Sequence, residues 1–117
     1  MTTNLWITKQ GATGRPLLLG LMVADALIDF ADLTTPVLRI RRKTSALAAA
    51  LEFVVTSYTD TFNTPALYNA QVVFTDWSDL TQGEYIADVV ADYEGELTMW
   101  PDDSYIGIRI LQGVAEV

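Results

Sequence analysis

This chain has no cysteine and no histidine, the two residue types on which much enzyme chemistry depends. Without cysteine it has no disulfide framework, no zinc–thiolate site and no thiol nucleophile. Without histidine it has no Ser-His-Asp triad and no imidazole acid/base chemistry. These absences exclude several enzyme classes, leave the redox compartment open and favour a binding function over catalysis.

Basic residues are also scarce, since 7 Lys and Arg stand against 15 Asp and Glu, for a net charge of -8. This balance argues against nucleic acid as a partner, because that binding depends on cations that neutralise phosphates. Yet 50% of the residues are hydrophobic. Two interpretations stand: apolar surface is buried against neighbouring subunits, or the domain is small and has few polar residues on its surface.

No apolar run is long enough to cross a bilayer. The most apolar segment, Pro16–Ala24, is interrupted by Gly20. Ala24-Asp25-Ala26 faintly resembles a signal-peptidase site, but few cations precede the run, so a signal peptide is the weaker interpretation. We predict instead that Leu17–Val23 forms a strand buried on both faces.

Period-two alternation punctuated by turn residues predicts a single antiparallel β domain over residues 1–117. The predicted strands are Leu5–Thr8, Leu17–Val23, Val37–Arg42, Leu51–Thr56, Gln71–Thr75, Tyr85–Asp92, Leu97–Trp100 and Tyr105–Leu111. About seven or eight short strands, with turns every ~8–12 residues, are typical of a β-sandwich.

The same alternation predicts which residues form the core. They are Tyr85, Ala87, Val89 and Ala91 in one strand and Ile106, Ile108 and Ile110 in another. In the strand before them, Leu38 and Ile40 face one way while Arg39 and Arg41 face the other.

The segments between these strands contain turn and loop residues. Asp25–Thr35 is predicted to be a connection that Pro36 stops, and Thr59–Asn69 to be a polar loop. Tyr93–Glu96 is predicted to be a hairpin turn. Thr44–Ala50 is ambiguous, because Ser45 is able to cap a short helix through the alanines that follow.

Several phrases of the sequence, taken in order, carry a resemblance to one family. They are Gly11–Pro16 before an apolar strand, Ala31–Thr34, Arg39–Arg41, Trp77–Leu80 leading to Gly83–Tyr85, and Trp100–Tyr105 before the final strand. From about Lys9 to Leu111, the chain resembles the immunoglobulin-like N-terminal domain of tailed-phage baseplate upper proteins and similar small β domains of phage structural proteins. The resemblance implies an all-β, immunoglobulin-like antiparallel β-sandwich without enzymatic activity or cofactor.

The resemblance also implies a location on the virion, after synthesis in the host cytoplasm. We expect a structural protein that docks on the capsid or on the tail and baseplate, as a decoration, an adaptor or a fibre-attachment module. The sequence to Val117 shows no coiled coil or stalk, so a decorating role is expected as much as an adaptor role. Expected partners are capsid, tail or fibre proteins and further copies of the chain, with no nucleic acid and no membrane. A host-surface glycan stays open.

A cation cluster, Arg39, Arg41, Arg42 and Lys43, holds four of the seven basic residues. It has three interpretations: contact with nucleic acid, a salt-bridge patch against an acidic neighbour, or a solvated strand face. The forked guanidinium suits a carboxylate partner, and the acidic excess of the chain makes contact between copies one version of that patch.

The aromatic residues give the second candidate interface. Trp6, Trp77 and Trp100 are predicted to contact a protein partner or, with Tyr85 and Tyr105, to form a sugar-stacking platform, as in a carbohydrate-binding module. That module is the alternative function from a different class. The simpler interpretation is packing in the core or at an edge, since burying a tryptophan stabilises a small domain.

The carboxylates do not form a recognisable catalytic or metal motif. A glycosidase needs two carboxylates at a set separation in a cleft, which their sequence spacing does not establish. Calcium binding by Asp102 and Asp103 is an alternative, but EF-hand spacing is absent. We therefore predict no catalytic residue and no metal site.

Overall fold

The computed structural model describes residues 4–9, 15–43, 51–75, 80–101 and 105–111. Over these residues the chain forms eleven strands and one short 3-10 helix. The strands are β1 (Asn4–Lys9), β2 (Leu17–Leu19), β3 (Met22–Val23), β4 (Ala26–Leu27), β5 (Leu33–Arg42), β6 (Leu51–Val54), β7 (Thr56–Ser57), β8 (Ala70–Val72), β9 (Gly83–Tyr93), β10 (Glu96–Trp100) and β11 (Ile106–Leu111). The helix, η1, spans Phe30–Asp32 and is capped by Asp29, whose carboxylate accepts a hydrogen bond from the Ala31 amide.

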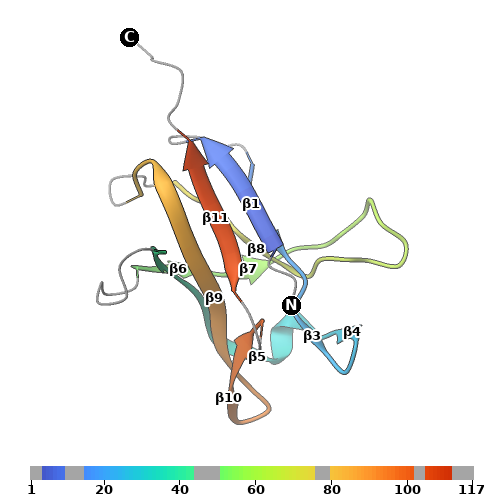
Figure 1. The fold of residues 1–117 in the computed structure, drawn as a ribbon. Helices are drawn as coiled ribbons and strands as arrows, with labels where there is room; N and C mark the ends of the chain where they lie inside the picture. Colours follow the sequence, from blue (N-terminus) through green and yellow to red (C-terminus); the bar gives the residue numbers. More distant parts are fainter. Residues whose placement is uncertain (1–3, 10–14, 44–50, 76–79, 102–104, 112–117) are drawn as a thin grey trace.

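Two sheets face each other and form a sandwich (Figure 1). The larger sheet has the order β1-β11-β9-β5-β6, with β10 also paired to β9, and the smaller one has the order β2-β8-β7. In a variable-type immunoglobulin domain, strands G, F, C and C′ form one sheet and strands B, E and D belong to the other. The larger sheet has the same order as the first of these, with β11, β9, β5 and β6 in the positions of G, F, C and C′. The smaller sheet has β2, β8 and β7 in the positions of B, E and D. The predicted all-β sandwich is confirmed, although the described residues form eleven strands instead of about seven or eight.

One apolar core lies between the two sheets. Leu38 and Ile40 of β5 are completely buried. The core residues predicted in β9 and β11 are each at most 7% exposed: Tyr85, Ala87, Val89, Ala91, Ile106, Ile108 and Ile110. Leu17, Leu19 and Val72 of the smaller sheet belong to the same cluster. The predicted parity of these strands is therefore confirmed.

Tyr85 joins the core to the connection that precedes β9. Its hydroxyl donates a hydrogen bond to the Thr81 carbonyl at 2.8 Å and accepts one from the Thr81 amide at 3.1 Å. A tyrosine near the start of strand F that bonds to backbone a few residues upstream is the tyrosine corner of immunoglobulin domains. This hydrogen-bond pair is independent support for the immunoglobulin-like assignment.

One strand pair departs from the predicted antiparallel arrangement. β1 pairs with β11 in parallel, with Trp6 opposite Ile108. The next strand, β2, belongs to the smaller sheet and does not pair with β1. The neighbour of β1 in the larger sheet is therefore β11, from the other end of the chain. The hairpin turn at Tyr93–Glu96 is confirmed: Glu94 and Gly95 have φ angles of 52° and 82°, as a type I′ turn requires.

The prediction of one doubly buried strand over Leu17–Val23 is wrong. The segment is divided into β2 and β3, and Met22 and Val23 are exposed. The division comes at Gly20 and Leu21, where the chain leaves the smaller sheet and enters the β3–β4 hairpin.

The predicted connection over Asp25–Thr35, ended by Pro36, is also wrong in part. This segment contains β4 and η1, and β5 already begins at Leu33. Pro36 lies inside β5, where the pairing with β9 shifts register between Thr34 and Val37. Proline has no amide hydrogen to donate, and a bulge tolerates it within a strand for that reason.

The segment predicted as one strand over Leu51–Thr56 belongs to both sheets. β6 pairs with β5 in the larger sheet, and β7 pairs with β8 in the smaller one. The break falls at Val55, which is buried between the sheets. Strand β8 begins and ends earlier than predicted, at Ala70 and Val72. The ambiguous segment Thr44–Ala50 lies outside the described residues.

Candidate binding groove

The predicted cation cluster is divided between two parts of the molecule. Arg39, on the outer face of β5, makes a two-pronged contact with Asp88 of β9, with both nitrogen–oxygen distances at 2.9 Å. The hydrogen bonds that Arg39 donates to the Asp88 carboxylate raise the pKa of Arg39. Arg39 is therefore paired with an acidic residue of its own chain. Arg41 lies on the same outer face, half-buried.

The other two cations lie at the end of β5. Arg42 donates hydrogen bonds to the Thr81 hydroxyl and to the Gln82 carbonyl, and its guanidinium lies 5.0 Å from the ring centroid of Tyr85. Arg42 therefore supports the tyrosine corner. Lys43 is exposed, and its amide bonds to the Glu84 carbonyl at 3.0 Å. The side chain of Arg42 is thus engaged at the end of β5, whereas that of Arg39 is engaged on the outer face.

Two of the three predicted tryptophans, Trp6 and Trp100, line a groove on the surface of the sandwich. Trp6 is half-buried and stacks on Phe74, with 5.4 Å between ring centroids. Trp100 is only 9% exposed, and its indole nitrogen donates a hydrogen bond to the Met22 carbonyl at 3.0 Å. Trp77, Asp102 and Asp103 lie outside the described residues.

The groove measures about 1170 Å³ and lies between β1, β2, the β3 hairpin and the end of β10. Its walls are mainly apolar, with Leu17 to Met22 along one side. Trp6, Trp100, Tyr58 and Tyr68 add four aromatic side chains, and Arg15 and Asp25 add one charge of each sign. An apolar groove with a few polar groups is the usual form of a ligand site.

The connection between β7 and β8 forms one wall of this groove, through Tyr58 and Tyr68 at its base. It passes very close to Gly20, where an added Cβ would collide with the Leu67 carbonyl oxygen. Only glycine allows the two backbones to approach so closely. The groove wall therefore depends on Gly20.

Asn69, at the end of the β7–β8 connection, holds this wall of the groove through side-chain hydrogen bonds to the backbone of Leu21 and Ile28. Its side-chain oxygen accepts a hydrogen bond from the Leu21 amide at 2.8 Å. Its side-chain nitrogen donates to the carbonyls of Leu21 and Ile28 at 3.1 and 2.8 Å. Asn69 is 9% exposed, so these bonds replace water for a buried amide group.

Asp60 organises the part of the connection that extends away from the groove. Its carboxylate accepts four hydrogen bonds, from the amides of Phe62, Asn63 and Leu67 and from the Asn63 side chain, at 2.9 to 3.1 Å. The Leu67 bond above all, with the others, lowers the pKa of Asp60 from 3.8 to about 2. A single carboxylate therefore orders a long loop at neutral pH.

Gly20, Asp60, Phe62 and Asn69 are functional candidates that the sequence patterns did not reveal. The exposed fraction of Phe62 is 88%, the largest among the exposed large apolar residues of the described chain. The sequence predicts a polar loop over Thr59–Asn69 and marks none of these residues within it. One local signal was available: an aspartate in a loop often accepts hydrogen bonds from the amides two and three residues after it, as Asp60 does from Phe62 and Asn63.

The described residues contain no group of three or more acidic side chains placed to hold a metal ion. Within the same residues, no helix is long and apolar enough to cross a membrane. No known family model matches the chain, and neither a curated protein nor a solved structure matches it.

Proposed function

We propose that this chain is a non-enzymatic binding module of a phage virion, which docks on capsid or tail proteins. The observation that carries the proposal is an aromatic and apolar groove beside a pre-ordered loop with an exposed aromatic tip. Apolar surface retained on a chain of net charge -8 is what a protein-docking domain needs. The resemblance to baseplate upper protein domains supports the virion location.

The test is incorporation into particles. Virions made with and without the gene are purified and analysed by mass spectrometry, and the purified chain is added back to the deficient particles. We expect the chain in stoichiometric amounts in wild-type virions, and saturable rebinding to deficient ones. A chain that is absent from virions and never rebinds would refute the proposal.

A carbohydrate-binding module is a second candidate because four aromatic side chains line one groove. Stacked sugars need such faces, and Tyr58 and Tyr68 are half-buried rather than sealed in the core. Glycan binding is measured by tryptophan fluorescence, since Trp6 and Trp100 line the groove. Tyr68→Ala should weaken binding, whereas Tyr105→Ala should not, because Tyr105 is 47% exposed and lies outside the groove. Equal loss in both variants, or no binding by the parent, removes this candidate.

A further inference from the structure

Strand β1 forms an open edge of the larger sheet (Figure 1). It pairs with β11 along its whole length, from Asn4 to Lys9, and among the described residues no other strand pairs with it. Because β11 takes the backbone hydrogen bonds on one side only, every second residue of β1 directs its amide and its carbonyl away from the sheet. An edge of this kind is a template for a further strand.

The usual protection of an edge strand is missing from β1. Charged side chains, proline and bulges normally prevent such an edge from pairing. From Leu5 to Thr8 the strand has no charge and no proline, and its pairing with β11 shows no shift in register. The other edge strands of the two main sheets are shorter than its six residues, with three in β2, four in β6, two in β7 and five in β10. Within the described part of the chain, β1 is therefore the edge best suited to accept a strand.

The side chains of β1 offer apolar surface on both of its faces. Leu5 and Ile7 are 53% and 42% exposed. Trp6 points to the opposite face, where it is half-buried and lines the groove. A strand added to β1 covers Trp6 with the side chains of one face and Leu5 and Ile7 with those of the other, and such cross-strand contacts stabilise a sheet.

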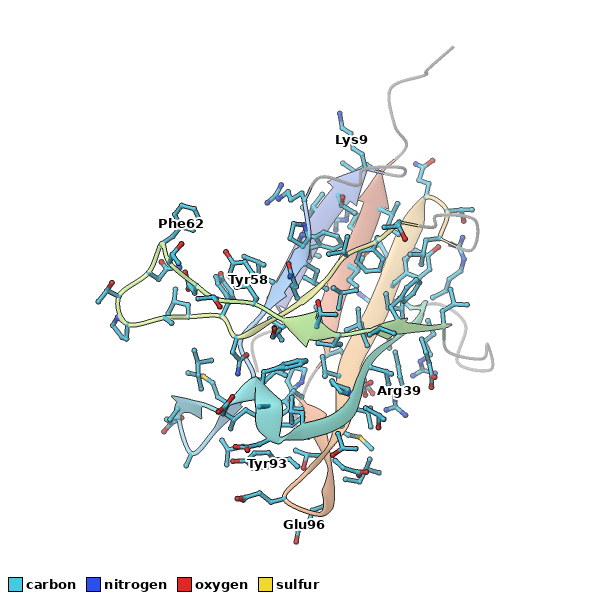
Figure 2. The ribbon with its side chains drawn as sticks, turned by 180° about the vertical axis from the view of Figure 1, so that it is seen from behind. Lys9, Arg39, Tyr58, Phe62, Tyr93 and Glu96 are labelled. Carbon is cyan, nitrogen blue, oxygen red and sulfur yellow. The ribbon has the colours of Figure 1, made fainter. Side chains whose placement is uncertain are left out.

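The two ends of this edge carry opposite charges. Lys9, the last residue of β1, lies at the upper end of the molecule (Figure 2). Asp25 lies in the turn of the β3–β4 hairpin, beyond the other end of β1 (Figure 1), and lines the same groove as Trp6. An antiparallel strand that begins with a carboxylate and ends with a cation complements both charges. The net charge of -8 disfavours another copy of the chain as the source of this strand and favours a different protein.

We propose that the chain binds its partner by strand addition: an extended segment of a different protein pairs antiparallel with the open edge of β1, covers Trp6 and continues the larger sheet. In this mode of recognition, backbone hydrogen bonds supply affinity and alternate side chains supply specificity. The inference gives the virion docking a physical mode, and it rests on that docking only for the identity of the partner.

Hydrogen exchange of the β1 amides tests strand addition. The probe is a short peptide that alternates valine and threonine between an initial glutamate and a final lysine, and the control peptide has proline at its two central positions. In the free chain, every second amide of β1 should exchange fast. Saturating probe should slow these amides by about ten-fold or more, because they gain a backbone acceptor, whereas the proline peptide should not. Unchanged exchange with the probe, or equal slowing by the control, would overturn the proposal.

Edge variants extend the test to particles that lack the chain. Leu5→Lys places a charge on the open edge. Val54→Lys is the matched control, because Val54 is 71% exposed but belongs to β6, at the opposite edge of the same sheet. Leu5→Lys should weaken rebinding to the particles by about ten-fold or more, and Val54→Lys should leave it unchanged, with circular dichroism confirming that both variants fold. Equal rebinding by the two variants would contradict strand addition.

A photoreactive residue at position 7 identifies the partner segment. The modified chain is bound to the deficient particles and irradiated, and the crosslinked peptides are sequenced by mass spectrometry. We expect one segment of a capsid or tail protein with apolar residues at alternate positions, and crosslinks to other copies of the chain would overturn the proposal. Protection of β1 by the probe without rebinding to particles refutes the virion docking alone. Rebinding without protection of the β1 amides refutes strand addition alone.

Discussion

The strand pair β5–β9 and the loop from Tyr58 to Asn69 are both ordered, but by different forces. In the strand pair, Leu38, Ile40 and Val89 are completely buried, and stability is shared among many apolar contacts. In the loop, almost every defining interaction ends on Asp60 or Asn69. The first region should therefore lose stability in proportion to the apolar surface removed. The second should lose its shape when one polar side chain changes.

The largest effect is expected in the apolar core. Ile108 is 2% exposed and lies opposite Tyr85. Ile108→Ala should lower the free energy of unfolding by roughly 2–5 kcal/mol, because a cavity remains where the side chain was. Denaturant unfolding measures this loss. The neighbouring Arg109→Ala is the control, since Arg109 points to solvent and should change stability very little.

Asn69→Ala should have the next largest effect. It leaves the buried Leu21 amide and the Ile28 carbonyl without their side-chain partner. An unsatisfied buried polar group costs about 1–3 kcal/mol. Chemical denaturation gives the loss, and hydrogen exchange should show faster exchange at Leu21. If exchange at Leu21 stays slow, Asn69 does not hold this segment.

A smaller effect is expected for the two ion pairs of the larger sheet, whose coupling free energies should differ. The Arg39–Asp88 pair makes two bonds at 2.9 Å and is partly shielded, whereas Arg109 and Glu84 are 3.7 Å apart and open to solvent. Double-mutant cycles should give a coupling of up to about 1 kcal/mol for the first pair and close to zero for the second. The charge-swapped variant Arg39→Asp with Asp88→Arg should recover part of the first coupling. Equal couplings would contradict the shielding argument.

Acid should loosen the loop by protonating the Asp60 carboxylate. The pKa of Asp60 is about 2 in the folded loop and 3.8 for the unperturbed group. The contribution of the carboxylate is therefore complete above pH 3.8 and is lost as the pH falls through about 2. NMR should show the Phe62 and Leu67 amide resonances shifting across that interval. In Asp60→Ala these shifts should be absent and the loop should be mobile at neutral pH.

The long strands could be predicted because burial on one face imposes a period of two. Tyr85 to Ala91 and Ile106 to Ile110 carry that period, so their parity followed directly from the sequence. The cations at Arg39 and Arg41 were likewise placed correctly on the outer face. The sequence indicated Trp6 and Trp100 as aromatic candidates, but their spacing could not predict that both line one groove.

The sequence by itself therefore determined the all-β class, the strand faces and the core of the larger sheet, because these depend on neighbours two residues apart. Only the tertiary structure decided the parallel pairing of β1 with β11, the change of sheet at Val55 and the groove beside Tyr58 and Tyr68. Those features join residues far apart in the chain, as Asn69 does with Leu21 across 48 positions. No local pattern encodes such a contact, since its free energy exists only after the two sheets have packed.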